Sequence, residues 1–150
     1  MAKTINQNQI PADIAMITKN LLLHVNDYEI AGLSELAGLY KRRIHNNGEA
    51  TDGSKIGNYK SAQYKAFRVL QNRQVSYKDL ELYGDLRRSE QIGVSNGRNV
   101  FGFTRDLSRL IAEGQQEQTG KIIFGVSDKE QQAADDAYIR ELNYHFNQIS

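Results

Sequence analysis

The sequence feature that most constrains the fold is the dipeptide Asn96-Gly97, which lies between two short runs of alternating apolar residues. Asn-Gly is preferred in two-residue type I′ hairpins, because both turn residues must adopt positive φ. Strands are therefore expected at 89–95 and 98–104. The register pairs residues outward from the turn: Ser95 with Arg98, Val94 with Asn99, and Ile92 with Phe101. One face then carries the apolar side chains and is expected to face the core: Ile92, Val94, Phe101 and Phe103.

Segments with the periodicity of a helix precede and follow this hairpin in the sequence. A long helix is expected from Tyr28 to about His45, because apolar residues recur along it at helical spacing: Ile30, Leu33, Ala37, Tyr40 and Ile44. A shorter helix is expected from Pro11 to about Asn26-Asp27, although Leu21–Val25 also fits a buried strand. The capping box Ser127-x-x-Glu130 predicts the start of a C-terminal helix.

Shorter elements complete the pattern. Ser61 is a suitable N-cap for a short helix with Tyr64, Phe67 and Leu70 on its inner side. Residues 86–88 predict a single helical turn. Residues 106–118 predict a helix that ends at Gly120 and has these residues facing inward: Leu107, Leu110 and Ile111. Residues 121–126 predict a third strand.

These elements predict an α+β fold in one domain spanning residues 1–150. A small antiparallel sheet, built on the hairpin, is expected to pack against the long helix of the N-terminal half and against the C-terminal helix. Residues 1–10 are expected to form a flexible leader. Residues 46–60 are expected to form a flexible loop, with a turn at Asp52-Gly53.

Composition excludes several classes of site. The chain has no cysteine, so disulfides and cysteine-based metal sites are ruled out. The polar first residues predict no secretory signal, and no apolar run approaches the ~20 residues of a membrane span. We therefore expect synthesis in a cytoplasm and no membrane partner.

Charge is distributed unevenly. Residues 41–88 contain 11 Lys and Arg against 5 Asp and Glu, a balance of +6, although the whole chain carries only +1. Such a dipolar chain can dock head-to-tail on copies of itself or turn its basic segment toward nucleic acid. The alternative is that both segments are solvated faces.

No motif assembles a reaction centre. The segment 48–55 resembles a phosphate-binding loop, but Ser54 and Lys55 are exchanged relative to that motif, and a helix precedes it. The three histidines, His24, His45 and His145, lie on separate predicted elements without ligand spacing. We therefore predict no enzymatic activity, no catalytic residues, no metal site and no cofactor.

Aromatic and basic residues interleave over residues 59–68, as in some proteins that stack bases and contact phosphates. The favoured interpretation is structural, with Tyr64 and Phe67 forming the buried side of a short helix. A small nucleic-acid-binding module is kept as an alternative function.

Three motifs, in this order, resemble the tail-completion and virion-morphogenesis proteins of tailed bacteriophages. The first is the Asp52-Gly53 turn with Tyr59 and Tyr64 after it. The second runs from Asp79 to Ser89 as D-L-x-L-x-G-D-L-x-x-S. The third is residues 122–127, which lead into the terminal helix. The sequence departs from the family where Lys55-Ile56 replaces an aromatic residue and where Tyr83 replaces a small hydroxyl residue.

The resemblance implies a structural subunit present in several copies as a ring in the phage neck, between the connector and the tail tube. Its partners would be copies of itself, portal-side and tail-tube proteins, and DNA passing through the lumen. Its location would be the virion, after synthesis in the bacterial host. A tail terminator that stops tube growth is an alternative within the same class. The residues expected to make assembly contacts are Lys41, Arg42, Arg43, Asp52, Gly53, Lys55, Arg87 and Arg88.

Overall fold

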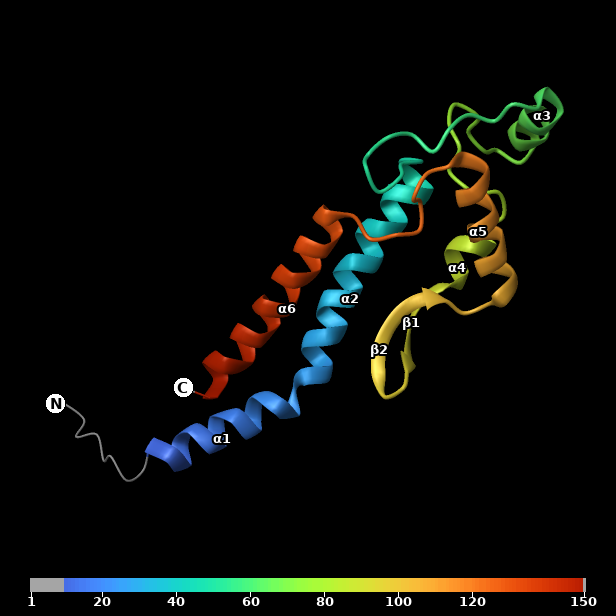
Figure 1. Cartoon of the computed structure of the whole chain (residues 1–150). Helices are drawn as coiled ribbons and strands as arrows, with labels where there is room; N and C mark the ends of the chain where they lie inside the picture. The colour runs from blue at the N-terminus through green and yellow to red at the C-terminus, as the bar shows by residue number, and fades with distance from the viewer. Residues whose placement is uncertain (1–9, 150) are drawn as a thin grey trace.

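The computed structural model describes residues 10–149, and Figure 1 shows helices at both ends of the chain around a small hairpin. The expected leader lies outside the described residues except for Ile10. The elements, in chain order, are α1 (Ile10–Leu23), α2 (Val25–Lys41), the π-helix η1 (Arg42–Asn46), α3 (Ala62–Leu70), α4 (Asp85–Ser89), β1 (Glu90–Ser95), β2 (Arg98–Phe103), α5 (Asp106–Thr119) and α6 (Asp128–Ile149).

The first two helices are separated by a single residue, His24, which has φ −107° and ψ 11° and breaks the helical path. The Tyr28 hydroxyl donates a 3.0 Å hydrogen bond back to the Leu21 carbonyl across the break. The predicted boundary at Asn26-Asp27 was therefore a few residues late. The alternative of a strand at 21–25 is wrong, because these residues continue the two helices.

The long helices α2 and α6 pack against each other along most of their length, as Figure 1 shows. They approach closely at Gly32, where a Cβ atom would lie 3.1 Å from the carbonyl oxygen of Ala134. The buried positions of α2 are Tyr28, Gly32, Leu36 and Tyr40. The predicted stripe was therefore partly wrong: Tyr40 and Ile44 are buried, whereas Ile30 is exposed.

The hairpin forms with the predicted register, including Ser95 opposite Arg98 and Ile92 opposite Phe101. Asn96 and Gly97 have φ values of 51° and 74°, as a type I′ turn requires. Phe101 packs edge-on against Tyr40 of α2, with ring centroids 5.1 Å apart. Val94 was expected in the core, but it is 73% exposed because the turn end of the hairpin extends into solvent.

The core lies where the C-terminal end of α2 meets the segments 48–58 and 121–126. Its buried members are Leu36, Tyr40, Ile44, Ile56, Ile123 and Ala134, with Leu80, Phe101 and Phe124 packed against them. The α+β fold class is confirmed, with a two-stranded antiparallel sheet in the described part of the chain. None of the described helices combines the length and the apolar character that crossing a membrane requires.

Two predicted segments are folded differently. Residues 121–126 form no strand, because bends at 121, 124 and 125 interrupt them, and the carbonyl of Ile122 accepts a hydrogen bond from the Thr51 amide. Residues 48–58 belong to the segment 46–60 that was expected to be a flexible loop. They fold into a turn against the core, closed by a bridge between Glu49 and Lys55, with Ala50 and Ile56 buried.

Two helices form where expected but bury other residues than predicted. Ser61 accepts the Tyr64 amide as the predicted N-cap of α3. The residue of α3 that is buried, however, is Arg68, and the predicted inner residues Tyr64, Phe67 and Leu70 are exposed. In α5, which ends at Gly120 as predicted, the buried residues are Ser108 and Ala112.

Candidate functional site

Arg43 joins distant parts of the chain from the start of η1. Its guanidinium pairs with the Glu130 carboxylate at 2.6 Å, and both side chains are largely buried. It also donates to the carbonyls of Glu49, Ile123 and Gly125 at distances from 2.8 to 3.0 Å. Arg43 was predicted to be an assembly contact. In the isolated chain its hydrogen-bonding groups are used inside the molecule, which leaves Arg43 little surface to offer another subunit.

His45 makes a second buried contact two residues further along η1. Its Nδ1 lies 3.1 Å from the Asp79 carbonyl, and its Nε2 lies 3.1 Å from Glu90 Oε2 of β1. Because a carbonyl oxygen only accepts, Nδ1 must carry a proton. Nε2 contacts the Glu90 carboxyl, so both ring nitrogens have a polar partner.

A third buried pair holds α3 in place. The Arg68 Nη2 donates to both carboxylate oxygens of Asp79 at 2.9 and 3.0 Å, and the Tyr59 hydroxyl donates to the same carboxylate at 2.9 Å. The guanidinium also lies over the Tyr59 ring, 4.3 Å from its centroid. Burial raises the pKa of Tyr59, so its phenol stays protonated and acts as a donor.

These three pairs bring the sequence motifs together. Arg43 contacts the turn segment at Glu49 and the third motif at Ile123 and Gly125. His45 contacts the second motif at Asp79. Parts of the chain that are up to 87 residues apart therefore converge on the C-terminal end of α2 and on η1.

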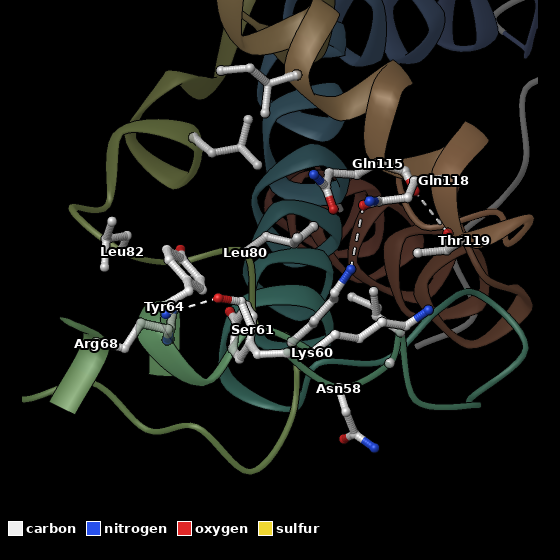
Figure 2. Close-up of a pocket in the computed structure, with 16 residues that line it drawn as sticks. Asn58, Lys60, Ser61, Tyr64, Arg68, Leu80, Leu82, Gln115, Gln118 and Thr119 are labelled. Carbon is white, nitrogen blue, oxygen red and sulfur yellow. Dashed lines mark hydrogen bonds between the residues drawn. The ribbon is translucent and has the colours of Figure 1, made fainter. Parts of the chain in front are cut away.

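A groove with a volume of about 640 Å³ lies beside Arg68, between α3 and α5. In Figure 2, Gln115, Gln118 and Thr119 of α5 line one side, Ser61 and Tyr64 line the other, and Leu80 lies between them. Arg68 Nη1 is buried and has no hydrogen-bond partner among residues 10–149. The groove combines an apolar floor with amide and hydroxyl groups, which suits a peptide segment better than a reaction centre.

The Asp52-Gly53 turn is exposed. Asp52 accepts hydrogen bonds from the side chain and the backbone amide of Ser54, at 2.6 and 2.9 Å. These bonds, the side-chain one first, hold the pKa of Asp52 below its ordinary value. Lys55 lies over the Tyr77 ring and donates to the Asn47 carbonyl at 2.7 Å. The turn is thus available at the surface, but Lys55 is held by its neighbours.

The remaining predicted contacts differ in availability. Arg87 pairs with Glu81 at 3.3 Å and Arg88 with Asp85 at 2.5 Å, so both are neutralised locally. Lys41 and Arg42 have no ion pair with any described residue, and Arg42 is exposed. The eight residues predicted from the sequence therefore do not form one basic patch.

Exposed apolar side chains form a different candidate surface. On α5, Leu107, Leu110 and Ile111 are 64%, 56% and 48% exposed. Their spacing places them on one side of the helix, and Ile111 also lines the groove. We call these three residues the α5 apolar face. They are the residues predicted to face the core, and nothing in the described chain covers them.

Sequence reasoning missed one constellation. His24, Asp27 and His145 place one ligand atom each within 4.8 Å of one another. The sequence shows no ligand spacing between His24 and His145. They nevertheless lie side by side, because α6 returns antiparallel to α2 and brings His145 beside His24. The spacing of His24 and Asp27, three residues apart across the helix break, was the one local signal.

Comparisons with known proteins provide no neighbour. No protein-family model, no curated protein and no solved structure matches the chain.

Proposed function

We propose that the chain is a structural subunit that assembles with copies of itself through the α5 apolar face and the adjoining groove. Its proposed place is a ring in the neck of a tailed bacteriophage, where it acts as a tail-completion or head–tail joining protein. The observation that carries the proposal is the α5 apolar face, a helical apolar stripe left in solvent. Contiguous exposed apolar surface of this kind is typical of interaction sites.

The total exposed surface supports this proposal. The chain exposes 10378 Å², whereas a compact monomer of 17.0 kDa exposes about 7,700 Å². Subtracting a generous ~150 Å² for each of the ten residues outside the described range still leaves an excess of about 1,200 Å². A standard interface buries about 800 Å² on each partner, so the excess is enough for contacts with neighbours.

The sheet and the motifs add support of different kinds. Each hairpin strand has one edge without a partner among the described residues, and such edges are normally covered. The phage assignment itself rests on the sequence motifs. The segments that carry the three motifs meet around η1 in the folded chain. Motifs shared by a family are expected to lie together in this way. A tail terminator remains the alternative within this class.

The test is a substitution on the α5 apolar face. Leu110→Glu places a charge in the proposed interface and is expected to reduce self-association at least tenfold without unfolding the monomer. Glu117→Gln, at an exposed position of the same helix, is the matched control and is expected to assemble normally. Sedimentation velocity and circular dichroism provide the readouts. Equal association of Leu110→Glu and wild type would contradict the proposal.

A nucleic-acid-binding module is the candidate from a different class. One observation favours it: Tyr64 and Phe67, expected to be buried, are 36% and 38% exposed next to Lys60. The ion pairs of Arg43, Arg68, Arg87 and Arg88 argue against it, because these guanidinium groups already contact carboxylates of the chain itself. Binding to single-stranded DNA at physiological salt that Tyr64→Ala abolishes would favour this candidate.

A further inference from the structure

His24, Asp27 and His145 form a cluster of potential metal ligands where the α1–α2 break meets α6. His24 Nδ1 lies 3.0 Å from Asp27 Oδ2, and His145 Nε2 lies 3.8 Å from the same oxygen. The Glu141 carboxylate, one turn before His145, lies 3.3 Å from His145 Nε2. Two imidazoles and the Asp27 carboxylate therefore converge from two segments that are more than a hundred residues apart in sequence, with Glu141 in contact with His145 alone.

We propose that this cluster is a Zn²⁺ site that connects the break between α1 and α2 to the C-terminal half of α6. Zinc binds imidazole nitrogen and carboxylate oxygen at about 2.0–2.2 Å in a tetrahedron, whose ligand atoms lie about 3.3 Å apart. The distances of 3.0, 3.3 and 3.8 Å in this cluster lie around that value. The site does not depend on the proposed ring.

The ligand types favour zinc over the hard cations. Magnesium and calcium prefer sets made of oxygen atoms only, whereas imidazole suits zinc and its neighbours in the first transition row. His24, Asp27 and His145 supply three ligands, and Glu141 or a water molecule completes the tetrahedron. Glu141 also lowers the local potential and so increases the attraction of a divalent cation.

A zinc ion can reach the cluster, and a histidine ring can turn to bind it. The side chains of His24 and Asp27 are 43% and 50% exposed, so an ion reaches the cluster directly from solvent. The two imidazole rings are stacked, with centroids 4.0 Å apart and planes 20° apart. Because each nitrogen lone pair lies in the plane of its ring, binding requires one ring to rotate. His24 is the more exposed of the two histidines and is the ring that turns.

His145 is held in position by its surroundings. It contacts the rings of Tyr28 and Tyr144, with centroids 5.6 and 5.3 Å from its own. Tyr28 is buried and bonds to Leu21 across the helix break. Zinc bound to His145 and His24 would therefore restrict the angle between α1 and the pair formed by α2 and α6. This predicts that zinc stabilises the packing of α1.

The primary experiment follows the three histidines by NMR while zinc is added to the whole chain at neutral pH. The imidazole signals of His24 and His145 are expected to shift, with saturation at one Zn²⁺ per chain. His45 is the internal control, because it is buried against Glu90 and its signals are expected to stay in place. Magnesium at the same concentration is expected to shift none of them. Zinc that leaves the His24 and His145 signals unchanged would overturn the proposal.

Substitutions make the test specific. His24→Ala and Asp27→Asn change exposed side chains at the cluster, and each is expected to weaken zinc binding at least about tenfold in calorimetry. Asp136→Asn, an exposed carboxylate of α6 outside the cluster, is the matched control and is expected to bind as wild type does. His145→Ala is avoided as the main variant because it also removes packing against Tyr28. Equal zinc affinity of His24→Ala and wild type would contradict the site.

Discussion

Buried charged residues determine how the segments around η1 are held together. Arg43, Arg68 and His45 each come from a segment read as basic surface, yet each is buried with a carboxylate partner. The arrangement is costly to break, because removing one partner leaves an unpaired charge in a region of low polarity. Their role is therefore structural in the isolated chain.

The Arg43–Glu130 pair gives a direct prediction at this scale. Arg43→Met should destabilise the fold by about 3–5 kcal/mol, since it leaves the Glu130 carboxylate buried and three carbonyls without their donor. Arg42→Met is the matched control, because Arg42 is the exposed neighbour in the same turn, and it should change stability by less than about 0.5 kcal/mol. Urea unfolding measures both. Equal effects of the two variants would contradict the role given to Arg43.

The Asp52 turn predicts a pH effect. Because the folded-state pKa of Asp52 is lowered, its contribution to stability is present above about pH 4 and is lost as the pH falls through the folded pKa. Ser54→Ala removes the main cause and should raise the Asp52 pKa toward its ordinary value of 3.8. Ser54→Thr keeps a hydroxyl and should preserve the low value. Carboxyl NMR titration provides the test, and an unchanged pKa in Ser54→Ala would contradict the account.

At the scale of the elements, close packing of α2 on α6 depends on a glycine. Gly32 lies against the backbone of α6, whereas a Cβ at Gly38 of the same helix would have no neighbour within 4 Å. Both positions are helical, so alanine gains a similar helix propensity of about 1 kcal/mol at each. Any difference between the two positions therefore reports the contact with α6.

The matched pair Gly32→Ala and Gly38→Ala separates these effects. Gly38→Ala should stabilise the protein by about 0.5–1 kcal/mol. Gly32→Ala should destabilise it by about 1–2 kcal/mol, because the helices must move apart to admit the methyl group. Thermal or urea unfolding measures both free energies. Equal stabilisation by the two substitutions would show that α6 does not lie as close to α2 as described.

Element by element, the sequence predicted what local signals encode. The Asn96-Gly97 turn, the Ser61 cap, the Ser127–Glu130 box and the Gly120 helix end all depend on residues close in sequence, and all are confirmed. The faces of α3 and α5 were predicted wrongly because apolar periodicity identifies a helix face but not what covers it. A face covered by another subunit has the same pattern as one covered by the core.

The long-range pairings could not be predicted from the sequence, because no local pattern indicates which distant residues meet. Arg43 meets Glu130 across 87 residues, and His24 meets His145 only because α6 runs antiparallel to α2. The third strand was predicted from a short apolar run, a pattern that does not distinguish a strand from an irregular segment. The predicted assembly residues were selected for charge and turn propensity. Only the exposed ones, such as Arg42, Asp52 and Gly53, stay available as contacts.

At the scale of the whole molecule, the described chain has more surface than its mass requires, and part of that surface is apolar. The α5 apolar face lies on a helix that is joined to the core segment through Gln116, whose side chain accepts the amides of Ile123 and Phe124. A rigid body with uncovered apolar faces is the form expected of a subunit whose fold is complete but whose surface is completed by neighbours.

The most direct test measures the mass and shape of the purified chain. Sedimentation velocity over about 1 to 100 µM protein, followed by negative-stain imaging of the heaviest species, reports whether copies associate and whether they close. The account predicts concentration-dependent assembly into a closed ring. A species of 17.0 kDa over the whole range, which also fails to enter any phage particle offered to it, would contradict the account.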